Sequence, residues 1–282
     1  DDALLLVLPW LDEVVIDTSA GVRTMRAERD GSRVAIAAQD HVTRWRTFTD
    51  SGQVPADVLA ERPVEERNRA VWSVTIAIPV DDAGVPQPLA ASVPSVLHAP
   101  TPTGEELSLP ALVVATVPVD AARRHVSEGA LATLVLENVA RVYAEAVVAF
   151  ATDPEVGPRA LDLIPGPSWR GVVDAQIVRA VLQALGDAVF LPAAASSDRL
   201  LRPREAFLLA DLGRGRGGDV SAESASTLGE VAPGLVDPSW WRPDVLVRLG
   251  VRELSVVDIV DAVAETVRTP AQWHRLYAAL DG

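Results

Sequence analysis

The segment from Gly129 to Phe150 constrains the fold of this chain most, because its apolar residues recur at the spacing of one helix face. The pattern predicts a long amphipathic helix that must bury its apolar side. The segment from Leu109 to Val117, shortly before it, is almost continuously apolar and predicts a strand that is buried on both faces. We therefore expect a sheet covered by a long helix in the first half of the chain.

Further strands are predicted ahead of this helix, where β-branched and apolar residues occur in series or alternate with polar ones. The predicted strands are Glu13–Asp17, Val22–Glu28, Ser32–Ala37, Val42–Thr49 and Val71–Pro79. Asp30-Gly31 predicts a tight turn between two of them. Residues 3–11 predict the end of a helix, residues 51–69 a polar connection or short helix, and residues 99–104 a loop that contains two prolines.

A stretch rich in proline and glycine, residues 151–168, predicts a boundary between a domain at 1–150 and a second domain at 151–282. The second domain is expected to be mainly helical, with short strands at 188–191 and 206–210. Its predicted helices are Val172–Leu185 with Gly186 at its end, Ser221–Val231, Pro243–Leu249, Ser255–Val267 and a last helix from Thr269-Pro270. Ser255 and Asp258 have the spacing of a variant capping box. The expected fold class is α/β (α+β).

The charge of the chain limits its partners. The formal net charge is −14, and all 25 positive side chains are arginine. This balance argues against nucleic acid and against anionic membrane surfaces as main partners, because both require a basic face. The chain has no cysteine, which is compatible with a reducing compartment, and no apolar run long enough to span a bilayer. We expect a cytoplasmic protein, and the start at Asp1 without a methionine or a basic leader predicts a piece of a larger one.

Several motifs give only weak signals for an active site. Asp211-Leu-Gly213-Arg-Gly215-Arg-Gly217-Gly218 has the glycine spacing of a phosphate loop. It lacks the lysine of a Walker loop and a second parallel strand after it, so a surface loop is the favoured interpretation. The four histidines lack metal-ligand spacing; they are His41, His98, His125 and His274.

Three other features have a structural interpretation as well as a functional one. The chain has no Gly-x-Ser-x-Gly elbow, so an independent hydrolase would need a convergent pocket in which His98 or His125 contacts an exposed serine. The acidic pairs Glu65-Glu66 and Glu105-Glu106 lie in polar stretches and predict solvated faces rather than acid–base carboxylates. Trp240-Trp241 is a possible binding platform, but core packing is favoured because aromatic side chains are usually buried.

The remaining candidate is the turn Val119–Val126, which joins the buried strand to the long helix. It carries Arg123, Arg124 and His125 in succession. Arginine presents a permanently charged fork of donors that suits a phosphate group. The alternative is a pair of surface arginines that form ion pairs with neighbouring acids, which is a common arrangement.

The order of this region resembles a module that follows the ATP-binding domain in bacterial sacsin-like proteins: an apolar strand, a proline, a short loop, Arg123-Arg124 and a long helix. Those proteins belong to the GHKL ATPase group, with the large heat-shock (Hsp90-type) chaperones, DNA gyrase and the mismatch-repair ATPases. Other stretches that carry the resemblance are Asp2–Thr18, Leu97–Thr103, Leu109–Arg124, Phe190–Pro192, Arg202–Ala206 and Arg248–Asp258.

The resemblance implies a transducer-like (ribosomal S5-like) sheet-plus-helix domain, followed by a mostly helical α/β domain. It also implies that the chain is not an enzyme alone but part of a GHKL-type ATPase of chaperone-like function. ATP and Mg²⁺ would be held by an upstream GHKL domain, and this segment would hold no cofactor or metal of its own. Arg123 or Arg124 would contact the γ-phosphate, with His125 as a further nucleotide contact.

The same resemblance implies a protein client or partner, and possible homodimer formation. The nucleotide site of the group requires a Glu-x-x-x-Asn helix, and neither Asn68 nor Asn138 has a glutamate four residues before it. Asp211, Gly213 and Gly215 spell the Asp-x-Gly-x-Gly turn, but they follow the transducer-like part, so we interpret the match as coincidence. The alternative function is a structural protein-interaction module attached to a degenerate ATPase.

Overall fold

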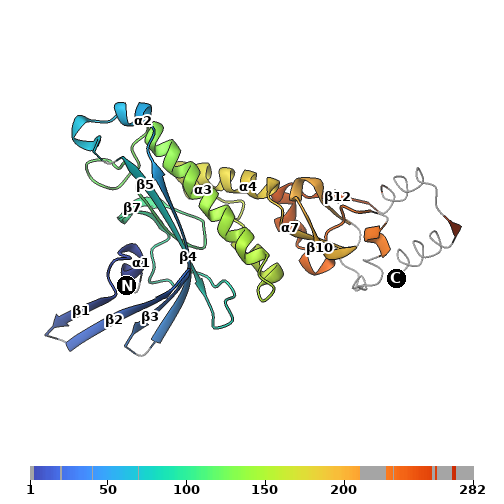
Figure 1. Cartoon of the computed structure of the whole chain (residues 1–282), viewed down its shortest axis with the longest axis horizontal. Helices are drawn as coiled ribbons and strands as arrows, with labels where there is room; N and C mark the ends of the chain where they lie inside the picture. The colour runs from blue at the N-terminus through green and yellow to red at the C-terminus, as the bar shows by residue number, and fades with distance from the viewer. Residues whose placement is uncertain are drawn as a thin grey trace. The chain divides into compact units, whose positions relative to one another are not determined.

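The computed structural model describes residues 3–19, 21–39, 41–68, 70–209, 227–230, 232–255, 258 and 269–270. The fold is mixed α+β, with one large mixed sheet and several helices (Figure 1). The chain divides into two compact units, Asp1–Val181 and Leu182–Gly282. This division lies within helix α4 (Val172–Asp187) and not in the proline-rich stretch at 151–168.

The first unit is built on an eight-stranded sheet in the order β1-β2-β3-β4-β5-β8-β6-β7. Its strands are β1 (Glu13–Thr18), β2 (Gly21–Asp30), β3 (Arg33–Ala38), β4 (His41–Gln53), β5 (Val71–Val80), β6 (Val96–Ala99), β7 (Thr101–Glu106) and β8 (Leu112–Ala115). Strands β1 to β5 form an antiparallel meander, and β8 pairs antiparallel with β5. Strands β6 and β8 are parallel, so their carboxyl ends meet at the same edge of the sheet.

The strands predicted in the first unit form, although the one expected at Leu109–Val117 is limited to β8, and the turn at Asp30-Gly31 forms as expected with Gly31 at a φ of 57°. In the second unit, the strand expected at 188–191 begins only at Leu191. Two further predictions are wrong in extent. Strand β4 continues through the polar residues 50–53, which pair with the start of β5, although a connection was expected there. Residues 101–106 form strand β7 at the outer edge of the sheet, where a loop was expected. An edge strand tolerates proline because one side of its backbone has no neighbour to bond.

The predicted long helix is α3 (Ala130–Ala151), which packs against β4, β5 and β8 (Figure 1). Its apolar face is fully buried, with Tyr143 and Phe150 at 0% exposure. Near its end, the ring centroids of Phe150 and Phe48 are 5.9 Å apart. The guanidinium of Arg46 lies over both rings and forms an ion pair with Asp153, 3.3 Å away. The sequence period therefore identified both the helix and the face that meets the sheet.

The opposite face of the sheet has its own apolar cluster. Side chains alternate between the two faces along a strand, so Trp45 on β4 lies on the face away from Phe48. Trp45 is 3% exposed and belongs to a cluster with Ile36 and with Leu5 of the short helix α1 (Leu4–Val7). The sheet is thus covered by α3 on one side and by α1 on the other.

Residues 151–168 do not form a simple linker. They include the 3₁₀ helix η2 (Gly157–Leu163), which packs against α3. The hydroxyl of Tyr143 donates a 2.6 Å hydrogen bond to the carbonyl of Leu163 within this contact. Proline and glycine in this stretch therefore mark a change of direction and not a separation between units.

The second unit contains two two-stranded sheets and several short helices. Strands β9 (Leu191–Ala193) and β10 (Ser196–Leu201) are antiparallel, and β11 (Phe207–Leu209) and β12 (Arg252–Leu254) are parallel. The helices are η3 (Pro203–Glu205), η4 (Pro238–Trp240), α7 (Pro243–Leu246) and η5 (Val247–Leu249). The predicted end of α4 at Gly186 is corrected, since the helix continues to Asp187.

Two local predictions in this unit are confirmed. Trp240 is 4% exposed, and Trp241 donates its indole N–H to the carbonyl of Val236 at 2.8 Å, so both pack into the fold. Ser255 and Asp258 form the predicted capping box, with the backbone and hydroxyl of Ser255 bonded to the carboxylate at 2.8 and 2.7 Å. The glycine-rich segment 211–218 and most of the predicted helices at 221–231 and 255–267 lie outside the described residues.

Candidate functional site

A cleft of about 1030 Å³ lies at the end of the sheet where parallel strands β6 and β8 finish. One wall is the β4–β5 connection, which holds the short helices α2 (Ala56–Ala60) and η1 (Val64–Glu66). The other wall is the segment from Thr116 to the first turn of α3. Crevices at the carboxyl ends of parallel strands are common places for ligands to bind.

The first turn of α3 contributes backbone groups to this cleft. Gly129, at the N-cap, has a φ of 143° and no side chain with which to cap the helix. The first turn contains no acidic residue. The first N–H groups of a helix have no partner within the helix itself. This wall of the cleft therefore has the partial positive charge of a helix N-terminus.

The turn that carries the predicted site residues is held closed by its own backbone. Val119 and Val126 form a β-bridge across its base, and the N–H of Asp120 donates to the carbonyl of His125 at 2.9 Å. At the tip, the N–H of Arg123 donates to the backbone carbonyl of Asp120 at 2.9 Å, and the N–H of Arg124 donates to the side-chain carboxylate of Asp120 at 2.8 Å. This second bond holds the pKa of Asp120 below its ordinary value.

Arg123 has a left-handed backbone conformation, with a φ of 56°. A residue with a side chain rarely adopts this conformation, and the hydrogen bonds of the turn impose it here. Arg123 and Arg124 are both exposed, and within the described part of the chain neither guanidinium forms an ion pair or hydrogen bond. The alternative of arginines paired with local acids therefore has no support in this structure.

Only one of these two arginines lines the cleft. Arg123 is part of its wall, whereas Arg124 is not. The other arginine of the cleft, Arg62, forms an ion pair with Glu66. Among the described residues of this cleft, Arg123 is thus the arginine whose guanidinium forms no ion pair.

His125 and Glu105 join the turn to strand β7. The ring Nδ1 of His125 lies 3.2 Å from Oε1 of Glu105, and the N–H of Val126 donates to the same oxygen at 3.1 Å. The N–H of Gly104 donates to the carbonyl of Arg124 at 2.6 Å. Glu105, expected on a solvated face, is therefore a docking residue with a side chain only 16% exposed. Its partners come from residues 125 and 126, so local sequence gave no signal of this role.

The residues of the other candidate sites, a histidine–serine pair and a metal centre, are not brought together among the described residues. His98 is 3% exposed and its Nδ1 lies 3.1 Å from the carbonyl of Val96, while burial lowers the pKa of the ring. Within the described residues, neither His98 nor His125 hydrogen bonds a serine. In the same part of the chain, no three His, Asp or Glu side chains are placed to hold a metal ion, and no described helix is long and apolar enough to cross a membrane.

Comparison of the chain with protein-family models, with curated proteins and with solved structures gives no match. The class that the structure itself defines is a mixed α+β protein in which the turn Val119–Val126, the basic turn, lines part of a cleft. The similarity to sacsin-like proteins stays a prediction.

Proposed function

We propose that this chain is the coupling segment of a sacsin-like, Hsp90-type ATPase, with a transducer-like first domain that presents Arg123 to a phosphate held by another domain. In this proposal the chain itself binds no nucleotide, and its basic turn senses the γ-phosphate of ATP bound upstream. The remaining surface would serve a protein client or partner.

The observation that carries the proposal is the state of Arg123. Arg123 lines a cleft, its guanidinium has no side-chain partner among the described residues, and it stands on a turn whose backbone is fixed at several points. A guanidinium carried on a fixed backbone and free of other ion pairs is available to stabilise charge that builds on a transferred phosphoryl group. Arg124 fits this role less well, since it does not line the cleft.

A second candidate function is a structural interaction module attached to a degenerate ATPase. The carboxylates at the cleft favour it, because Asp120 and Glu128 line the same wall as Arg123, and Glu61 lines the other wall. They would repel a phosphate group unless a bound metal ion or the partner domain offset their charge.

The test is the ATPase activity of the natural protein that contains this chain, compared with its Arg123→Ala variant. Loss of a group that acts on the transition state should lower kcat by about 10²-fold and leave KM for ATP nearly unchanged. The matched control is Arg159→Ala, an exposed arginine on η2 that forms an ion pair with Asp162. It should retain full activity.

Two outcomes would overturn the proposal. Unchanged kcat in Arg123→Ala would remove the assigned role of the turn, and absence of hydrolysis in the natural protein would favour the structural module. A calorimetric titration of the 282-residue chain with ATP adds an independent readout. Submicromolar binding there would show that the chain has a nucleotide site of its own.

A further inference from the structure

We propose that the segment Thr101–Ser108 mechanically connects the basic turn to helix α4, so that a change at the turn alters the attachment of α4 to the first unit. Contacts at both ends of this short segment carry the inference. It extends the proposed function by naming a route away from the turn, but it concerns only the fold and does not require any particular ligand there.

At one end, β7 holds the basic turn. Gly104 donates its N–H to the carbonyl of Arg124 at 2.6 Å, and the Glu105 carboxylate accepts from the N–H of Val126. There is little space at this contact, because a Cβ added to Gly104 would lie 3.1 Å from the Arg124 carbonyl oxygen. A displacement of the turn must therefore displace β7 or break these bonds.

The middle of the segment is firmly seated in the sheet. Thr103 donates its hydroxyl to the carbonyl of Leu97 at 2.7 Å, and the N–H of Leu107 donates to the carbonyl of Ser95 at 2.8 Å. The side chain of Leu107 is 1% exposed. The segment is therefore held along its length, so strain at one end is not absorbed by local deformation in the middle.

At the other end, the segment holds the beginning of α4 through a buried carboxylate. Asp174 is completely buried and accepts three hydrogen bonds, from the N–H and hydroxyl of Ser108 at 2.9 and 3.0 Å and from the N–H of Arg170 at 2.8 Å. Glu106 adds an exposed ion pair with Arg170 at 3.4 Å. A buried carboxylate that is bonded only to donors depends on all of them, so it fixes α4 to Ser108.

Helix α4 continues past Val181 into the second unit as one uninterrupted helix. The attachment at Asp174 lies in its first turn. Whatever loosens or tightens this attachment therefore acts on the element by which the chain enters the second unit. Continuous networks of packed and hydrogen-bonded groups of this kind can carry coupling between sites, and a coupling measurement is what tests it.

The test is hydrogen exchange of the whole chain, with Asp174→Asn as the first variant. The side-chain amide of this variant has an NH2 group in place of one carboxylate oxygen. That group cannot accept a hydrogen bond, so it faces the N–H of either Ser108 or Arg170 without bonding to it. Exchange should become roughly tenfold faster at the first-turn amide of Ala175 and also at Gly104 and Ser127 around the distant turn. The reciprocal variant, Glu105→Leu, removes the oxygen that accepts from the turn and should accelerate exchange at Ala175, because coupling between two sites is mutual.

The control for general loss of stability is Tyr143→Phe, which weakens the first unit away from this route. The inference is overturned if Asp174→Asn and Glu105→Leu each affect only their own end, or if Tyr143→Phe changes both ends by the same factor at equal loss of stability. If Asp174→Asn does not fold, Glu105→Leu and Ser108→Ala decide the question from the other positions. None of these readouts involves ATP, so failure here leaves the proposed role of Arg123 intact, and the reverse also holds.

Discussion

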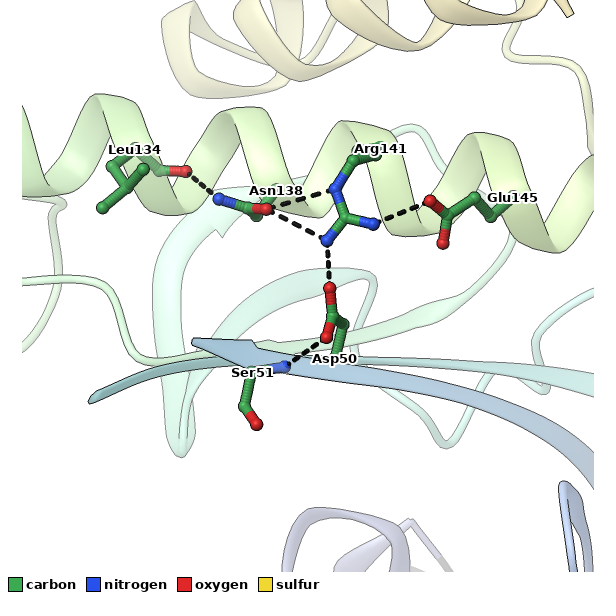
Figure 2. Close-up of polar contacts among 6 residues, drawn as sticks. All are labelled: Asp50, Ser51, Leu134, Asn138, Arg141 and Glu145. Carbon is green, nitrogen blue, oxygen red and sulfur yellow. Dashed lines mark hydrogen bonds and ion pairs between the residues drawn. The ribbon is translucent and has the colours of Figure 1, made fainter. Parts of the chain in front are cut away.

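Arg141 on α3 donates a hydrogen bond to the carboxylate of Asp50 on β4 and so ties the long helix to the sheet (Figure 2). The same guanidinium reaches Glu145 at 2.7 Å and the side-chain oxygen of Asn138 at 3.1 Å. The other Asp50 oxygen accepts the N–H of Ser51 at 2.7 Å. Apolar packing alone leaves a helix some freedom to rotate over a sheet, and this network selects one orientation for α3, the helix whose first turn lines the cleft.

The pH dependence of stability should reveal this contact. The hydrogen bond from Arg141 holds the pKa of Asp50 below its ordinary value of 3.8. A carboxylate with a lowered pKa in the folded state contributes stability that is present above the unfolded pKa and is lost as the pH falls through the folded pKa. Urea denaturation of Asp50→Asn should therefore show a smaller loss of stability on acidification below about pH 4 than the wild type shows.

The control for this prediction is Asp17→Asn, on the exposed strand β1. This substitution should leave the acid loss of stability as it is in the wild type. Equal acid sensitivity of Asp50→Asn and the wild type would show that the Arg141 contact does not contribute to the pH dependence.

Tyr143→Phe should destabilise the first unit by about 1 to 2 kcal/mol, because the Leu163 carbonyl loses its donor. The ring of Tyr143 is completely buried and its hydroxyl donates to that carbonyl at 2.6 Å. Burial also raises the pKa of the hydroxyl, so it stays a donor at all physiological pH values. Urea denaturation measures the loss, and Tyr143→Leu should cost more because the ring packing is lost as well. An unchanged unfolding free energy in Tyr143→Phe would contradict this account.

The elements that sequence predicts well are those whose burial is periodic. The expected helix from Gly129 to Phe150 matches α3 (Ala130–Ala151), because its buried positions follow the helical repeat over many turns. Strand β5 was equally clear, since its apolar residues face both α3 and the opposite cluster. The mixed α+β class followed from these two signals together.

The features that sequence did not predict depend on partners far along the chain. Pro102 in β7 and Pro100 just before it suggest a loop, and only the place of β7 at the sheet edge allows a strand there. Asp174 adjoins the apolar stripe of α4. Nothing in the neighbouring sequence indicates that it is buried or that Ser108 donates two hydrogen bonds to it. The role of Glu105 was missed for the same reason. Its neighbours in the sequence are polar and predict an exposed side chain, whereas its carboxylate contacts the ring of His125 and the N–H of Val126 in the basic turn.

The pairing of Gly52 with Trp72 gives a final prediction, at the ends of β4 and β5 beside the cleft. The two residues are directly opposite in the sheet, and the indole covers the glycine. A Cβ on Gly52 would lie 2.9 Å from Cζ2 of Trp72, which is 9% exposed and has little room to move. Gly52→Ala should therefore cost about 1 to 3 kcal/mol of unfolding free energy.

A double-mutant cycle separates this overlap from an effect on the backbone. In a Trp72→Leu background the indole is absent, so Gly52→Ala should cost much less than it does in the wild type, and the difference is the interaction energy of the pair. Gly166→Ala is the matched control, because a Cβ there meets nothing within 4 Å. If Gly52→Ala costs the same in both backgrounds, contact with the indole is not the reason that position 52 requires glycine.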